Sequence, residues 1–174
     1  MSIVMEQRKL NNEIIRRLRS DKPGMVIPVL NHLRQSVHAS EYLQEIFNLL
    51  YQTSDSNTRR ELALFLSDIK DPAAVPKIIA VLNDKKYRPV WSILTASCWQ
   101  SGLDYSNNLD TFIRLLLEED YVTALEAFSV IEQSLHHLQE KKMKIHRQQL
   151  IDGLKEVDKD KAPLVREMIK IMLE

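Results

Sequence analysis

An internal repeat restricts the possible folds of this chain more than any other feature of its sequence. When the sequence is shifted by 34 residues against itself without gaps, apolar positions coincide over two consecutive segments. The first segment matches Val75 with Leu109, Ile78 with Phe112, Ile79 with Ile113, and Leu82 with Leu116. The second matches Tyr87 with Tyr121, Val90 with Ala124, Ile93 with Ala127, Leu94 with Phe128, and Ser97 with Ile131. The shift predicts that residues 71–104 and 105–138 form two superimposable helical hairpins.

Apolar residues recur at spacings of three and four along the whole chain, and alternating β-branched runs are missing. This period is that of an amphipathic helix, so we expect no strand and an all-α fold. None of the links is long enough to separate domains, and a single domain over residues 1–174 is predicted. The ten predicted helices are 3–19, 23–36, 40–52, 58–69, 72–83, 88–101, 106–118, 121–137, 141–157 and 161–173.

Several residues predict where these helices begin and end. Asp71 before Pro72 predicts a helix start, because the carboxylate accepts from free amides of the first turn and proline lacks only an unpaired N–H. Thr58 and Glu61 have the spacing of a capping box. Gly102 suits the left-handed conformation that ends many helices. Two further caps are predicted at Ser106 and Asp160.

The remaining copies of the repeat are weaker. Ile27-Pro28 aligns with Val75-Pro76 at a shift of 48, which differs from the 34 of the central units. Two apolar stripes near the C-terminus, at 143–157 and 164–172, pair as helices but match the repeat poorly. Degenerate outer units are typical of stacked repeats, because each end unit has one face in water.

The composition excludes several classes of site. The 3 glycines are too far apart for a phosphate-binding loop, which needs two or three within about six residues. Cys98 is the one cysteine, and it cannot form an intrachain disulfide or a thiolate cluster. Neither histidines nor the acidic run 118–120 show the spacing of a metal site or a catalytic pair. We therefore expect no cofactor, no metal and no enzyme activity.

The ends of the sequence and its apolar runs bear on localisation. The apolar stretch near Met1 is shorter than the roughly 7 to 15 residues of a signal sequence. The longest apolar runs, such as 62–66, fall far below the roughly 20 residues of a transmembrane helix. With one thiol and no visible export signal, the prediction is a cytoplasmic protein without a membrane partner.

The charge is balanced overall but uneven along the chain. There are 24 Lys and Arg against 24 Asp and Glu, and the segments 1–38, 39–84, 85–138 and 139–174 carry +4, −3, −3 and +2. A basic cluster on the first predicted helix could contact an anion or a nucleic acid, but the same helix is an ordinary amphipathic one with a solvated face. Because nucleic-acid-binding domains usually carry a general basic excess, nucleic acid is an unlikely partner. The basic cluster comprises Arg8, Lys9, Arg16, Arg17 and Arg19.

The central segment resembles a known repeat family. Residues 66–84 read Leu-Ser-Asp-Ile-Lys-Asp-Pro-Ala-Ala-Val-Pro-Lys-Ile-Ile-Ala-Val-Leu-Asn-Asp, which is similar to the central part of a HEAT repeat. The next helix of that repeat usually opens with Val-Arg, whereas this sequence has Val90-Trp91. The resemblance is strong for residues 58–138, moderate for 21–57 and poor for 139–174. It implies a right-handed α-α superhelix of about five antiparallel helix pairs, an armadillo-like α-solenoid whose second helices line a concave face.

The two tryptophans are the leading candidates for a binding surface. Trp91 and Trp99 lie eight residues apart on one side of one helix, flanking the predicted core stripe that contains Leu94. They serve either packing between repeats or recognition of a partner. We expect at least one of them to be partly exposed. Arg59 is predicted to project along or beside the same concave strip, and the candidate binding residues are Trp91, Thr95, Trp99, Leu125, Ser129 and Gln133.

These observations favour a non-catalytic scaffold that binds a protein or peptide partner on its concave face. One alternative is a nucleic-acid-binding or DNA-repair protein resembling the HEAT-like alkylpurine DNA glycosylases, which use a basic concave channel with aromatic residues. A small helical bundle with accidental repeats is a third interpretation.

Overall fold

The computed structural model describes residues 11–173, and all the regular structure in this range is helical. Each of the ten predicted helices is present, so the all-α prediction is confirmed. Four short 3₁₀ helices precede or follow them: η1 (Ala39–Tyr42), η2 (Lys85–Val90), η3 (Ser106–Asn108) and η4 (Leu135–His137). The α-helices are α1 (Asn12–Leu18), α2 (Pro23–Arg34), α3 (Leu43–Gln52), α4 (Ser56–Asp68), α5 (Ala74–Leu82), α6 (Trp91–Ser101), α7 (Leu109–Glu118), α8 (Tyr121–Ser134), α9 (Glu140–Gly153) and α10 (Ala162–Ile171). Residues 3–10 of the first predicted helix lie outside the described range.

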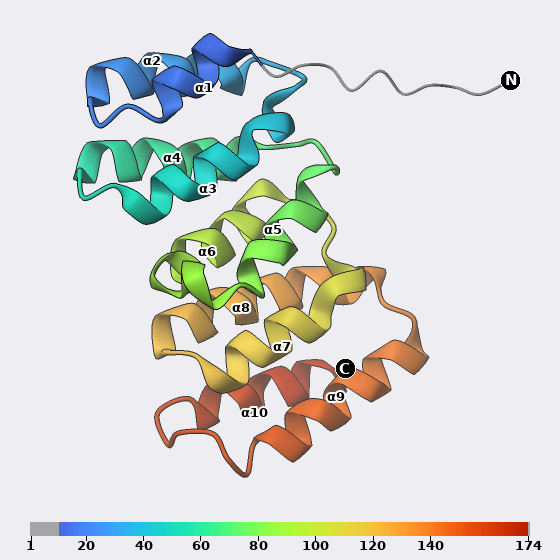
Figure 1. Cartoon of the computed structure of the whole chain (residues 1–174). Helices are drawn as coiled ribbons and strands as arrows, with labels where there is room; N and C mark the ends of the chain where they lie inside the picture. The colour runs from blue at the N-terminus through green and yellow to red at the C-terminus, as the bar shows by residue number, and fades with distance from the viewer. Residues whose placement is uncertain (1–10, 174) are drawn as a thin grey trace, which may run out of the picture.

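The helices form two layers that follow the order of the chain (Figure 1). In one layer α2 packs on α4, α4 on α6, α6 on α8, and α8 on α10. In the other layer α1 contacts α3, α3 contacts α5, and α7 contacts α9. Each odd-numbered helix also contacts the even-numbered helix that follows it. Buried apolar side chains from Leu18 to Met172 form one continuous cluster between the layers.

The predicted 34-residue repeat holds for the first helices of the two central hairpins and is wrong for the second helices, which are in a different register. For α5 and α7 the 34-residue shift holds, since Ile78 and Phe112 are both buried, as are Leu82 and Leu116. For α6 and α8 it fails, because Leu94 is fully buried while Phe128 is only partly buried.

A shift of 33 residues aligns the buried faces of α6 and α8 instead. A change of one residue in register turns every side chain of α8 by about 100°, so the predicted register placed the wrong face inward. The same error explains why Tyr87 is buried whereas Tyr121 is half exposed. The buried pairs are Trp91 with Ala124, Leu94 with Ala127, Ser97 with Val130, Cys98 with Ile131, and Ser101 with Ser134.

The alignment of Ile27-Pro28 with Val75-Pro76 is not a structural repeat. The first pair lies in α2 and the second in α5, and these helices belong to different layers of the stack. The similarity reflects only a shared helical pattern, and the two prolines differ in position, since Pro28 lies inside α2 and Pro76 lies near the start of α5.

The helix ends agree with the sequence at one position and differ at others. Gly102 ends α6 with φ 67°, as predicted. The Thr58–Glu61 capping box is wrong, because the Asp55 carboxylate caps α4 by accepting from the Thr58 amide at 2.7 Å. Asp71 does accept from the Ala73 amide at 2.9 Å, but α5 begins only at Ala74.

The last two predicted caps are also wrong. The cap positions of η3 and α7 are Tyr105 and Asn108, and neither side chain makes a capping hydrogen bond. The Asp104 carboxylate accepts from the Ser106 amide at 2.8 Å. At the start of α10 the cap position is Lys161, and its side chain makes no capping hydrogen bond. Lys161 is instead buried, and its ammonium group donates to the backbone carbonyls of Leu117 at 2.8 Å and Glu119 at 2.6 Å. These carbonyls lie at the end of α7, so the hydrogen bonds of Lys161 connect the α9–α10 hairpin to the α7–α8 hairpin.

Candidate functional site

Two of the six predicted binding residues point into the core. Trp91 is only 2% exposed, its indole N–H donates to the Val81 carbonyl at 2.9 Å, and the Arg114 guanidinium lies 5.1 Å from its ring. Thr95 is fully buried one turn later on α6. These two residues therefore pack the repeat and present no surface to a partner, because α6 is packed between α4 and α8.

The other four predicted residues lie outside the fully buried core. Trp99 is partly buried, and its indole N–H donates to the Glu126 carboxylate of α8 at 2.6 Å. The expectation that at least one tryptophan is partly exposed is thus confirmed. Leu125 and Gln133 are exposed, with partly buried Ser129 one turn from each.

Two residues that sequence reasoning did not select extend this surface. Val122 is 57% exposed and Tyr121 is 50% exposed, both at the start of α8, beside Leu125 at 42%. Val122, Leu125, Ser129 and Gln133 follow each other at spacings of three and four, so they share one face of the helix. We call this set, with Tyr121, the α8 strip. The signal that could have found it is the alternative shift of 33 residues, which pairs Leu125 with Ser92 and leaves the two alanines of α8 facing inward.

Acidic residues outnumber basic ones next to the α8 strip, where Lys159 lines a shallow pocket with Asp120 and Tyr121. Helix α8 contains no Lys or Arg, and it carries Glu126 and Glu132. Glu118 and Asp120, both exposed, lie directly before the helix. An apolar centre with carboxylates at its rim has the general composition of a protein-binding surface.

Arg59 lies in α4, away from the α8 strip. Its guanidinium donates to the Thr53 carbonyl at 2.9 Å, and its side chain is partly buried. The residue closes the link between α3 and α4, which is a structural role.

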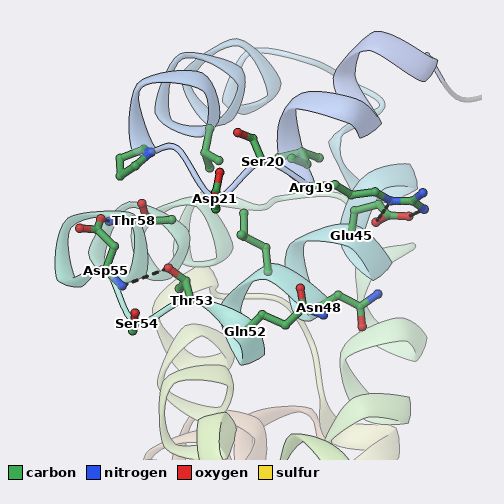
Figure 2. A pocket seen from close by; sticks show the side chains of 14 residues that line it. Arg19, Ser20, Asp21, Glu45, Asn48, Gln52, Thr53, Ser54, Asp55 and Thr58 are labelled. Carbon is green, nitrogen blue, oxygen red and sulfur yellow. Dashed lines mark hydrogen bonds and ion pairs between the residues drawn. The ribbon is translucent and has the colours of Figure 1, made fainter.

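A pocket of about 580 Å³ opens where the α1–α2 turn meets α3 and the α3–α4 link. Figure 2 shows Ser20 and Asp21 on one side, Asn48 and Gln52 on another, and Thr53 to Asp55 on a third. The apolar part of the lining comes from Leu18, Pro23, Val26 and Leu49. We call this cavity the inter-hairpin pocket; its size is that of a small-molecule site.

Hydrogen bonds order several polar side chains of this pocket. The Arg19 guanidinium donates to both oxygens of Glu45, at 3.0 and 2.7 Å. The hydrogen bond from Arg19 lowers the pKa of Glu45, and those from the backbone and hydroxyl of Thr58 lower the pKa of Asp55. Both carboxylates are therefore charged at neutral pH.

The basic first helix is largely paired within the described residues. Arg16 and Arg17 each contact Glu13, with shortest distances of 2.8 Å, and Arg19 contacts Glu45 at 2.7 Å. Arg8 and Lys9 lie outside the described range. Arg16 and Arg17 share one carboxylate, so α1 keeps one positive charge in excess for phosphate contacts, which are the main source of affinity for nucleic acids.

A reactive cysteine and a metal site are two further kinds of site that the residue types could form, and the structure supports neither among the described residues. Cys98 is fully buried and bonds the Leu94 carbonyl at 3.2 Å, and burial raises the pKa of its thiol to about 12. Such a thiol is inert at neutral pH. Among residues 11–173, no group of three or more His, Cys, Asp or Glu side chains is placed to hold a metal ion.

The fold places the described part of this chain in the class of all-α proteins built from stacked helical hairpins. Neither the models of known protein families nor the curated proteins include a match to this sequence. Within residues 11–173, every helix is too short or too polar to cross a membrane.

Proposed function

We propose that this protein is a non-catalytic, HEAT-like α-solenoid scaffold that binds a protein partner through the α8 strip. The observation that carries the proposal is the exposure of three neighbouring apolar side chains, Tyr121, Val122 and Leu125, at the start of one helix. Clustered exposed apolar residues of this kind mark interaction surfaces more often than isolated ones do.

The surroundings of the strip indicate the chemistry of the partner. Glu118, Asp120 and Glu132 lie around the apolar residues, and α8 supplies no positive charge. A segment with apolar residues flanked by Lys or Arg therefore complements this surface. The stacking of α2, α4, α6, α8 and α10 in one layer supports the solenoid part of the proposal.

The proposal is tested by comparing the proteins captured by three forms of the chain under the same conditions. The form with Val122→Asp and Leu125→Asp replaces the apolar centre by charge and should lose a partner that the wild type retains. Quantitative mass spectrometry of the captured proteins measures this difference.

Ile145→Asp provides the matched control, because Ile145 is 52% exposed on α9, in the other layer. It should retain the same partner as the wild type. Circular dichroism should show all three forms equally helical. If the double variant captures the same proteins as the wild type in the same amounts, the α8 strip is not the binding surface.

A further inference from the structure

The inter-hairpin pocket is a second candidate site, separate from the α8 strip. It lies at the junction of the first two hairpins, whereas the strip lies on the fourth. Its volume of about 580 Å³ accommodates a small organic ligand or a long side chain.

One wall of the pocket is aliphatic and buried. Leu18 and Val26 are each 1% exposed and Leu49 is 8% exposed, so these side chains are held in place by the core. Leu18 and Val26 lie behind the lining, whereas Leu49 and the partly buried Pro23 provide the apolar surface against which a chain of methylene groups loses water.

The polar part of the lining is predominantly negative. Asp21, Glu45 and Asp55 contribute three carboxylates against the single guanidinium of Arg19, which gives the lining a formal charge of −2. Asp21 is exposed, and Figure 2 shows its carboxylate between the two hairpins. The amide and hydroxyl groups of Gln52 and Ser54 add neutral acceptors nearby.

The protein already places one cation in this pocket. The guanidinium of Arg19 lies on Glu45 with two hydrogen bonds, in the planar geometry that suits a guanidinium and a carboxylate. Arg19 neutralises one carboxylate, so the excess negative charge is that of Asp21 and Asp55. An incoming cation would find both an aliphatic wall and these two carboxylates.

We propose that the inter-hairpin pocket binds an aliphatic chain that ends in an ammonium or guanidinium group. The same chemistry occurs in a free polyamine and in the side chain of Lys or Arg within a peptide. The methylene groups contact Pro23 and Leu49, and the charged end group lies between Asp21 and Asp55.

The test is a titration of the full chain with a small-molecule probe, in which nuclear magnetic resonance measures the chemical shifts of the backbone amides. The probe is n-butylguanidinium, and its neutral match is n-butylurea, which has a similar shape without the charge. We expect saturable shifts at residues 18–26 and 45–58 with the guanidinium only. Spermidine and an acetylated, amidated Gly-Arg-Gly peptide then distinguish a free polyamine from a peptide side chain, according to which of them binds more tightly.

Two substitutions should change the affinity in opposite directions. Asp21→Asn removes a charge at an exposed position and should weaken binding about fivefold, the size of one exposed charge interaction. Arg19→Gln leaves Glu45 unpaired and should tighten binding by a similar factor. Glu156→Gln, an exposed substitution on the link after α9, is the matched control and should have no effect.

Three results would overturn the proposal. One is equal binding of n-butylurea and n-butylguanidinium. Another is a set of shifts that fails to saturate and spreads over acidic residues throughout the surface. The last is an affinity that neither Asp21→Asn nor Arg19→Gln changes.

Discussion

Helices α6 and α8 occupy equivalent places in neighbouring hairpins, yet their first turns distribute large side chains in opposite ways. Facing the core, α6 has Trp91 and Leu94 where α8 has Ala124 and Ala127. On the outward face of these turns the order is reversed, because the 33-residue register places Ser92 of α6 opposite Leu125 of α8.

The contrast separates residues that stabilise the stack from residues available to a partner. A tryptophan facing inward contributes to folding by the apolar area that it buries. Large apolar residues facing outward contribute little to folding, because water still contacts them. The difference therefore identifies α8 rather than α6 as the candidate binding helix, although α6 contains both tryptophans.

The largest expected effect is on the buried face of α6. Trp91→Ala should lower the free energy of unfolding by about 3 to 5 kcal/mol, because it opens a cavity and leaves the Val81 carbonyl without the indole donor. Urea denaturation followed by circular dichroism measures this change. A loss below about 1 kcal/mol would contradict the core role of Trp91.

The alanines of α8 provide the next test. Ala127 is fully buried against the neighbouring helices, and Ala127→Leu should destabilise the protein by about 1 to 3 kcal/mol through overpacking. The same urea denaturation applies. If the leucine were tolerated without loss, the contact between α6 and α8 would contain unfilled space, and the inward assignment of this face would be in doubt.

A smaller effect is expected at the start of α8, where Asp120 accepts from the Thr123 amide at 3.1 Å. Asp120→Ala should cost about 1 kcal/mol at pH 7, as for other lost caps. Asp120→Asn retains an acceptor and should lower the free energy of unfolding by only a few tenths of a kcal/mol.

The effect of Asp120 should also depend on pH. Burial raises the pKa of Asp120, but the hydrogen bonds from Thr123 and Val122 outweigh burial, and the pKa lies below its ordinary value. Because the folded-state pKa is the lower one, the stabilisation is fully present above the unfolded pKa of about 3.9 and is lost as the pH falls through the folded pKa. The stability difference between the wild type and Asp120→Ala should therefore narrow below about pH 4. A difference that stays constant from pH 7 to pH 2 would show that the carboxylate charge has no part in the cap.

The smallest expected effect on stability is at the outward face of α8. Leu125→Ala should change the free energy of unfolding by no more than about 0.5 kcal/mol, since Leu125 is 42% exposed. Thermal denaturation of Leu125→Ala and Trp91→Ala under the same conditions compares the two losses of stability directly. A loss comparable with that of Trp91→Ala would show that Leu125 belongs to the core and would remove it from the α8 strip.

The sequence was sufficient to predict the number and type of the helices, because the signal for a helix is local. Apolar spacing of three and four, and Gly102 at a helix end, depend on neighbours within a few residues. The repeat was also visible as similarity between α5 and α7. The capping box at Thr58 was wrong because Asp55, three residues earlier, offers the same geometry with a charged acceptor.

Which side of each second helix faces the core was decided only by the tertiary structure. Both a 34- and a 33-residue shift align apolar residues, and a change of one residue in register rotates the face of α8 by about 100°. The packing of α6 between α4 and α8 placed Trp91 and Thr95 inside, and the register of α8 brought Val122 and Leu125 to the surface. The inter-hairpin pocket likewise depends on segments 18–26 and 45–58 meeting across two hairpins. Local periodicity determines that each segment is helical, whereas the packing of one hairpin on the next determines which side chains remain available to a ligand.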